Sequence, residues 1–308
     1  MAVPVFSRAH VEAAVSPERA LEAVRDAFIA YARGEWTMPS KVYVPAYPAG
    51  DFRAMPALGG GHALLKWVTS FPGNPAQGLP TVSGVVLLSD ASNGMLVAAL
   101  DAGAVTALRT GAAAVLAAET LGRDGAAAVI GAGVNGRAVV RTFVARGRSV
   151  LLYDVDTERA EAAADVGAHA VPREEALAAN VVVTVTPGHE IVFPYGSLRA
   201  GQHVSLMGAD GPGKAEIAVE EMARVRMFSD DWEQASHNGD LAHAVEAGRV
   251  ARDDVTQLGD VLAGAADGRR GEDEITAFDS TGLAIQDLAV ALAALEHAHE
   301  LDLPTLEL

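Results

Sequence analysis

The chain has 308 residues, which is enough for one large domain or two ordinary ones. It contains no cysteine, and this excludes disulfides, thiolate nucleophiles and cysteine metal sites. A formal net charge of −17, from 40 acidic and 23 basic residues, opposes binding to nucleic acid or anionic lipid.

The N-terminal stretch MAVPVFSRAHVEAAV has neither a basic n-region nor a long apolar h-region, so we do not expect a signal peptide. We also expect no segment to reach the ~20 apolar residues of a membrane-spanning helix. The sequence therefore predicts a soluble, cytoplasmic protein without a membrane partner.

The first third of the chain predicts a small α+β domain. Ser16 or Pro17 begins a helix that Gly34 ends. Met38–Pro48 contains three prolines, which favours an edge strand or an extended segment. The remaining elements expected in this part are a strand at Ala63–Ser70, a hairpin of Thr81–Ser89 with Met95–Leu100, and a helix at Ala104–Leu121.

Lys66 stands in the middle of the apolar strand ALLKWVTS. Burying an ammonium is costly unless it is paired. Two interpretations remain open from the pattern alone: an edge strand with Lys66 in solvent, or an anion-binding lysine that faces a pocket.

The stretch Ala126–Val155 contains the strongest local signal. A short apolar run is followed directly by Gly131, Gly133 and Gly136, in the order G-x-G-x-x-G, and then by a helical pattern. These glycines permit a tight turn, a close approach of the backbone to a pyrophosphate, and close packing of helix on strand. The start of the helix offers unpaired N–H groups to phosphates. The pattern predicts a dinucleotide site, with a structural βαβ turn as the alternative.

Asp154 ends the next apolar run, about twenty residues beyond the glycines. A carboxylate there can accept hydrogen bonds from the ribose hydroxyls and would repel a 2′-phosphate. The cofactor expected is therefore NAD, with NADP possible.

Strands and helices continue to alternate as far as Ala277, which predicts a doubly wound parallel sheet. Thr186 follows the buried strand Val181–Val185, at the end where open α/β sheets bind ligands. The loop Gly208–Lys214 follows the strand Gln202–Met207 in the same way, and its alternative interpretation is a solvated Asp-Gly turn. A polar, glycine-rich stretch, Gly259–Asp273, precedes the last strand. The final long helix, Leu283–Glu300, is predicted to pack on the first domain or across a subunit boundary.

Several separated stretches together resemble the ornithine cyclodeaminase/mu-crystallin family. They are ALLKWVTSFPGN, LPTVSGVVLLSDASNG, VTALRTGAA, GAGVNG, MGADGPGKAEI and DSTGLAIQDLA. The resemblance implies an α/β fold with a Rossmann dinucleotide-binding domain, residues 114–280, and a smaller α+β substrate and dimerisation domain. The smaller domain comprises residues 1–113 and is completed by the C-terminal helix, 281–308. It also implies a homodimer and a small amino-acid or cyclic-imine substrate.

The same resemblance assigns the substrate site residue by residue. Lys66 matches the lysine that binds the substrate carboxylate, and Asp210 matches the aspartate proposed as acid/base on the substrate nitrogen. Arg109 and Thr281 are assigned to the substrate as well. Lys41 stands where many relatives have an arginine; it keeps the charge but loses the bidentate fork of a guanidinium.

The predicted cofactor contacts come from the glycine-turn pattern and from the family resemblance. The glycine turn supplies some of them, and the resemblance supplies others, with Arg109 near the cofactor phosphates. The full set is Thr81, Arg109, Thr110, Gly131, Gly133, Val134, Asn135, Gly136, Asp154, Thr186, Lys214 and Ser280. No metal site is expected.

These residue types suit hydride transfer at the α-carbon of an amino acid. A carboxylate such as Asp210 can take a proton from the amine, and a cation such as Lys66 can hold the α-carboxylate. The resemblance therefore favours an NAD(P)-dependent amino-acid dehydrogenase, such as an alanine dehydrogenase, or a reductase of cyclic ketimines such as pyrroline-2-carboxylate. An ornithine or lysine cyclodeaminase is the alternative within the same chemistry. A mu-crystallin-like binding protein is the alternative of another class.

Overall fold

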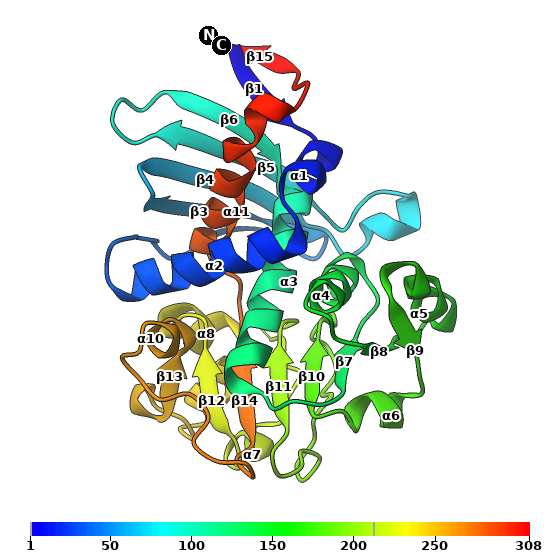
Figure 1. Ribbon diagram of the computed structural model, residues 1–308. Helices are drawn as coiled ribbons and strands as arrows, with labels where there is room; N and C mark the ends of the chain where they lie inside the picture. Colours follow the sequence, from blue (N-terminus) through cyan, green and yellow to red (C-terminus); the bar gives the residue numbers. More distant parts are fainter. Residues whose placement is uncertain (1, 212) are drawn as a thin grey trace. The chain divides into compact units, whose positions relative to one another are not determined.

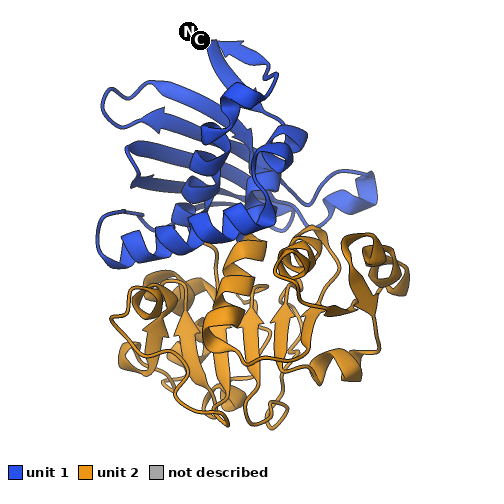
Figure 2. Cartoon of the chain, in the orientation of Figure 1, with its two compact units in different colours: residues 1–109, 283–308 blue, residues 110–282 orange. Residues whose placement is uncertain are grey.

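The computed structural model describes residues 2–211 and 213–308. Pro212, part of the predicted loop Gly208–Lys214, lies outside the described residues. The chain divides into two compact units (Figure 2). Unit 1 comprises the residues up to Arg109 together with Leu283–Leu308, and unit 2 comprises Thr110–Gly282. These boundaries fall a few residues away from those predicted at 113/114 and 280/281.

Unit 1 is built on a seven-stranded sheet of order β15-β1-β6-β5-β4-β3-β2 (Figure 1). Its neighbours are antiparallel except for the parallel pair β1 and β6. The strands are β1 Ala2–Phe6, β2 Val42–Ala46, β3 Gly50–Gly59, β4 His62–Ser70, β5 Val82–Asp90, β6 Leu96–Asp101 and β15 Thr305–Glu307. The proline-containing strand β2 lies at the edge of the sheet, as predicted.

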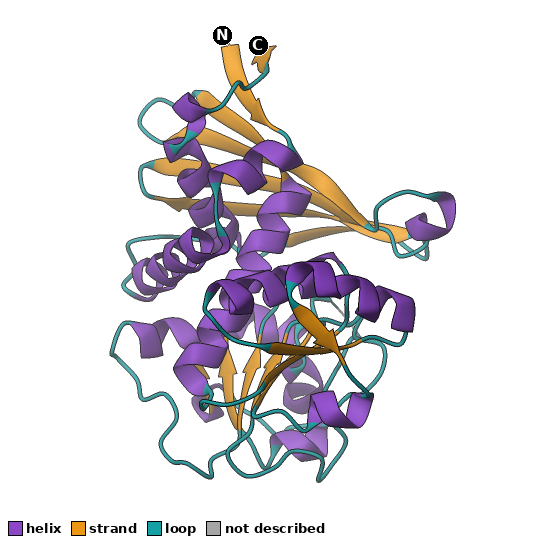
Figure 3. Cartoon of the chain, turned by 45° about the vertical axis from the view of Figure 1, so that its right-hand side comes forward, coloured by secondary structure: helices purple, strands orange, loops and turns teal. Residues whose placement is uncertain are grey.

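Helices cover one face of this sheet (Figure 3). They are α1 Arg8–Ala14, α2 Pro17–Ala32 and α11 Ala284–Glu296, and α11 packs against β3, β4 and β5. Side chains alternate along β4 accordingly: Leu64, Lys66 and Val68 are buried on the face that α11 covers, which we call the inner face. Leu65 and Trp67 point to the outer face. Of the two interpretations left open for Lys66, the edge strand with the lysine in solvent is therefore wrong, because β4 lies between β3 and β5.

Unit 2 is a doubly wound sheet of eight parallel strands, in the order β13-β12-β14-β11-β10-β7-β8-β9 (Figure 1). The strands are β7 Ala127–Ile130, β8 Val150–Tyr153, β9 Ala168–Ala170, β10 Val181–Thr184, β11 His203–Leu206, β12 Arg226–Ser229, β13 Val255–Gln257 and β14 Thr276–Asp279. Strands β7, β10, β11 and β14 are buried at every residue. Burial on both faces explains why β7 and β10 are nearly continuous apolar runs rather than alternating ones. Strands β11 and β14 also bury polar side chains, namely His203, Ser205, Thr276 and Asp279.

Helices connect the parallel strands of unit 2. They are α4 Val134–Ala145, α5 Thr157–Ala162, α6 Arg173–Leu177, α7 Val219–Met222, α8 Trp232–Asn238, α9 Leu241–Glu246 and α10 Leu258–Leu262. Val139, Val140 and Phe143 form the fully buried side of α4, the helix that was predicted to follow the glycine turn. Each such side chain contributes about 1.5–3 kcal/mol of burial free energy.

Helix α3, Ala102–Leu121, corrects one prediction about membranes. Among the described residues it is the one helix long and apolar enough, by length and composition, to cross a membrane. The sequence had predicted no segment of this kind. In its most apolar window of 18 residues, 72% are buried within the protein, so α3 is a core helix.

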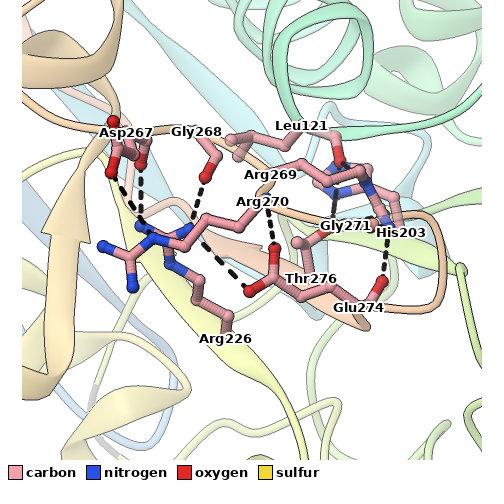
Figure 4. A network of polar contacts seen from close by, with 10 residues as sticks. All are labelled: Leu121, His203, Arg226, Asp267, Gly268, Arg269, Arg270, Gly271, Glu274 and Thr276. Carbon is pink, nitrogen blue, oxygen red and sulfur yellow. Dashed lines mark hydrogen bonds and ion pairs between the residues drawn. The ribbon is translucent and has the colours of Figure 1, made fainter.

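The glycine-rich stretch Gly259–Asp273 begins within helix α10. Two arginines fix the remainder at the amino-terminal edge of the sheet (Figure 4). Arg226 donates to the carbonyls of Asp267 and Gly268, and Arg269 donates to those of Leu121 and Glu274.

Other elements gave little signal in the sequence. The short pieces β1, α1, β13, α8 and β15 were not predicted, and α11 ends at Glu296 rather than Glu300. Strand β15 pairs antiparallel with β1, so the two ends of the chain lie side by side. Such non-local pairing cannot be read from either segment alone.

Candidate dinucleotide and anion sites

The glycine turn has the geometry of a dinucleotide-binding loop. Gly133 is the N-cap of α4, and among the described residues no side chain caps this helix end. A Cβ at Gly133 would meet nothing within 4 Å, so the turn is open toward a ligand. A Cβ at Gly136 would overlap the carbonyl oxygen of Gly131, so only glycine allows this contact between helix and turn. Val134, at the first position of the helix, is 60% exposed, and Asn135 is half-buried.

Asp154 connects the next strand to this turn. Its Oδ2 accepts from the backbone N–H of Ala132 at 2.6 Å, and its Oδ1 accepts from the N–H of Asp156 at 2.9 Å. The side chain is buried at the carboxyl end of β8. Each oxygen keeps a second lone pair for a ribose hydroxyl, so this position fits the predicted role and also orders the turn.

Two predicted residues follow neighbouring parallel strands. Thr186 follows β10, and its N–H and hydroxyl both donate to Glu216 Oε1, at 3.1 and 2.6 Å. Asp210 follows β11 and forms an ion pair with Lys214, with 2.6 Å between Nζ and Oδ1. These side chains are 35% and 23% exposed, so the pair remains accessible. The structure therefore brings together Asp210 and Lys214, which the sequence analysis assigned to separate roles.

Ser280 follows β14, the strand on the other side of β11. Its hydroxyl donates to Asp230 Oδ2 at 3.0 Å, and the N–H of Gly282 donates to the same oxygen at 2.8 Å. Thr281, which stands between Ser280 and Gly282 in the sequence, is also buried. Thr186, Asp210 and Ser280 thus leave one edge of the sheet, which is where open α/β sheets bind ligands.

Lys66 lies in a buried group of charges on the inner face of unit 1. Its Nζ donates to Asp287 Oδ1 of α11 at 2.9 Å, and Arg109 Nε lies 3.7 Å from the same oxygen. Arg53, on the neighbouring strand β3, pairs with Asp51 at 2.6 Å. We call Asp51, Arg53, Lys66, Arg109 and Asp287 the inner-face cluster. Burial and the nearby arginines lower the pKa of Lys66 to about 8, although Asp287 opposes this shift.

The inner-face cluster carries more positive than negative charge, since it contains three cations and two carboxylates. Arg109 Nε is buried without a hydrogen-bond partner among the described residues, and so is Asp287 Oδ2. The single hydrogen bond recorded for Lys66 Nζ uses one of its three donors. An excess buried cation with spare donors is the arrangement that binds an anion.

The remaining predicted residues occupy simpler positions. Lys41 directly precedes β2 and is half-buried, Thr81 directly precedes β5, and Thr110 is buried on α3. Their roles stay predictions. Sequence reasoning missed Arg53, Asp287 and Glu216. Arg53 could have been found, because it alternates with Asp51, Met55 and other buried residues along one face of β3.

The fold and the glycine turn together define a Rossmann-type dinucleotide-binding protein with a second, α+β unit. The sequence matches the ornithine cyclodeaminase/mu-crystallin family over residues 3–301. The chain belongs to this family, as the resemblance predicted, and it is an enzyme.

Individual relatives agree with this assignment. The chain is 41% identical over 305 residues to the alanine dehydrogenase of Archaeoglobus fulgidus, covering 96% of this chain and 94% of the relative. Its structure is similar to that of an archaeal alanine dehydrogenase dimer with bound NAD, with a TM-score of 0.94, 39% identity and coverage of 100% and 99%. It is also similar to the Δ1-pyrroline-2-carboxylate reductase of Thermococcus litoralis, solved with NADH and L-proline. That match has a TM-score of 0.92, 28% identity and coverage of 99% and 100%.

Proposed function

We propose that this protein is an NAD-dependent oxidoreductase that acts at the α-carbon of a small L-amino acid or of the corresponding imine. The observation that carries the proposal is the net positive charge of the inner-face cluster around Lys66. A substrate α-carboxylate would supply the missing negative charge. The alanine dehydrogenase and proline-bound reductase among the relatives support a substrate of this class.

Lys66 is proposed to bind the substrate carboxylate, with Arg109 beside it. An ammonium and a guanidinium that share one carboxylate, Asp287, are already oriented before a ligand arrives. Preorganised donors bind without a further cost of ordering, and they hold the Cα–H bond in a fixed direction.

Asp210 is proposed to move the proton. Oxidation of an amino acid requires a neutral amine, because its lone pair forms the C=N bond as hydride leaves Cα. A carboxylate can take the N–H proton in this direction and return it when an imine is reduced. The ion pair with Lys214 holds the Asp210 side chain within the loop.

NAD would supply the hydride acceptor, and NADH the donor in reverse. The residues present fit this cofactor, because the turn at Gly133 is open and the end of α4 is uncapped. Asp154 is proposed to bind the adenosine ribose, which favours NAD over NADP.

A substrate panel tests the proposal directly. The protein is incubated with NADH and pyruvate plus ammonia, pyrroline-2-carboxylate or piperideine-2-carboxylate, and separately with NAD and a set of L-amino acids that includes ornithine. We expect NADH absorbance to change with at least one member. Asp210→Asn should lower kcat by about 100-fold or more. Lys66→Met should raise KM by about 10- to 100-fold.

Two other results would redirect the assignment. Ammonia release from ornithine without net change in NADH would indicate a cyclodeaminase, in which the cofactor is recycled. Tight binding of a hydrophobic aromatic acid without any turnover would indicate a mu-crystallin-like binding protein.

We also propose that the protein is a homodimer that uses the outer face of the unit 1 sheet. Large apolar side chains are exposed there, with Trp67 at 39%, Leu65 at 40% and Leu58 at 46%. Apolar side chains gathered on one sheet face favour association. An archaeal relative is a dimer. Light scattering coupled to size exclusion measures the mass, and a monomer at micromolar concentration would contradict the proposal.

A further inference from the structure

Glu216 is a fully buried carboxylate that connects two loops at the ligand-binding edge of unit 2. Its Oε1 accepts from the N–H and the hydroxyl of Thr186. Its Oε2 accepts from the hydroxyl of Thr184 at 2.7 Å and from the N–H of Gly208 at 2.8 Å. Each oxygen therefore holds one backbone N–H, and the two N–H groups belong to different loops.

These loops follow two adjacent parallel strands that end at paired residues of the sheet. Thr184 ends β10 and is paired with Leu206, which ends β11. Asp210 stands only two residues beyond Gly208, on the loop that Glu216 binds. The approach is close, because a Cβ at Gly208 would lie 2.5 Å from Glu216 Oε1. A change in the Glu216 side chain therefore acts directly on the backbone that carries Asp210.

The segment around Glu216 is itself held firmly. Asp240 Oδ1 accepts from the N–H groups of Glu216 and Ile217, at 2.5 and 3.1 Å. The N–H of Ala215 donates to the carbonyl of Gly188 at 2.9 Å. Burial raises the pKa of the Glu216 carboxyl, while the four donors that face it oppose this shift. The four hydrogen bonds that compensate for burying this ionisable group come from the end of β10 and from the two loops that follow β10 and β11.

We propose that Glu216 is a positioning residue, which fixes the loop of Asp210 relative to Thr186 and so sets the direction from which Asp210 reaches the substrate nitrogen. This inference rests on the proposed function of Asp210. Glu216 acts through the loops and touches neither substrate nor cofactor.

Glutamine is the decisive replacement, because it keeps the shape but has only one acceptor oxygen. The threonine hydroxyls can turn to accept from an NH2 group, but a backbone N–H cannot. If the NH2 replaces Oε1 it faces the N–H of Thr186, and if it replaces Oε2 it faces the N–H of Gly208. Either orientation of the new side-chain amide in the Glu216→Gln variant therefore releases one of the two loops.

Glu221 provides a matched control. It is also a fully buried glutamate of unit 2, and it accepts from the N–H groups of Gly196 and Leu198, at 2.6 and 2.8 Å. These amides lie in the connection before β11, at the opposite end of that strand from Gly208. Glu221 also forms an ion pair with Arg224, with 2.8 Å between Nη1 and each carboxylate oxygen. Glu221→Gln therefore disturbs two backbone hydrogen bonds and an ion pair, which makes it at least as severe as Glu216→Gln, without touching the loops that follow β10 and β11.

Hydrogen exchange measured by mass spectrometry tests the positioning without requiring turnover. Glu216→Gln should raise amide exchange in peptides that contain residues 186–188 or 207–211, and leave residues 195–199 at the parental rate. Glu221→Gln should do the reverse. Equal exchange of the two loops in the parental protein and in Glu216→Gln would overturn the inference. Thr184→Val, which removes one hydroxyl donor, should give a weaker change of the same kind and serves if Glu216→Gln does not fold.

Kinetics then test the consequence for Asp210. On the substrate that the panel identifies, Glu216→Gln should lower kcat by about 10- to 100-fold, whereas Glu221→Gln should leave it within about threefold of the parental value. On an Asp210→Asn background, Glu216→Gln should add little, because its effect passes through Asp210. A full additional loss on that background, or loosened loops with parental kcat, would refute the positioning role. A parental protein without any turnover would instead refute the proposed function and leave the exchange result to decide the positioning.

Discussion

The pKa of Lys66 gives a quantitative test of the anion site. Because this pKa is lowered to about 8, the ammonium is charged at neutral pH and loses its proton in a range where an ordinary lysine stays charged. Affinity for a substrate carboxylate should therefore be constant below pH 8 and fall by about tenfold per pH unit above it. Pyruvate is a suitable probe, since it has no group that titrates between about pH 6 and 10. Its binding to the protein–NADH complex can be followed by NADH fluorescence.

Two variants make the test specific. Lys66→Arg replaces the ammonium with a guanidinium that does not titrate in this range, so its pyruvate affinity should be flat up to about pH 10. Asp287→Asn removes the charge that raises the pKa of Lys66, so the decline should begin below pH 8. A decline that persists in Lys66→Arg, or one that moves to higher pH in Asp287→Asn, would show that another group controls anion binding.

Three further predictions concern the glycine turn, the outer face and stability. Gly133→Ala should weaken NADH binding but keep the parental Tm. Gly136→Ala should weaken NADH binding and also lower the Tm, because the added Cβ would overlap the Gly131 carbonyl oxygen. Equal Tm values for the two variants in calorimetry would contradict this prediction. Trp67→Glu should convert the dimer to a monomer in light scattering; an unchanged mass would exclude the outer face as the interface. The pKa of Lys66 is about 8 in the folded state and 10.5 in the unfolded state, so between these pH values the unfolded chain binds one more proton. The free energy of unfolding should therefore rise by up to about 3 kcal/mol between pH 8 and 10.5. Urea titrations measure this rise, and Lys66→Met should lack it.

The parallel sheet of unit 2 could be predicted because its signals are local. The strand, glycine turn, helix and Asp154 follow one another within about thirty residues. Strands β7, β8 and β10 are nearly continuous apolar runs, and the turn after β7 contains the three glycines. The ends of β10 and β11 were also predictable, and with them the positions of Thr186 and Asp210. What could not be read was that one side chain from a later segment, Glu216, binds both loops.

The inner-face cluster of unit 1, by contrast, could not be predicted, because it depends on contacts between residues far apart in the sequence. The partner of Lys66 stands 221 residues away in the sequence, on a helix that the chain reaches only after completing unit 2. Asp287 is one of two acidic residues in the largely apolar helix α11, the other being Glu296 at its end, and in the sequence it resembles a solvated position. Only the return of α11 to the inner face of the sheet shows that this aspartate is buried.

The sum of charges on the inner face distinguishes a structural ion pair from a ligand site. If Lys66 and Asp287 formed a pair without other charges nearby, the lysine would need no ligand, and replacing both residues with apolar ones would be neutral or stabilising. Arg109 alters that conclusion, because it shares the same carboxylate oxygen and its Nε has no other partner among the described residues. Arg53 does not supply the missing charge, since its cation is matched by Asp51. A buried cluster with one cation in excess is relieved either by loss of the Lys66 proton or by an anion, and below pH 8 the anion is the remaining route. This charge balance, more than the presence of any one residue, connects unit 1 to a carboxylate substrate.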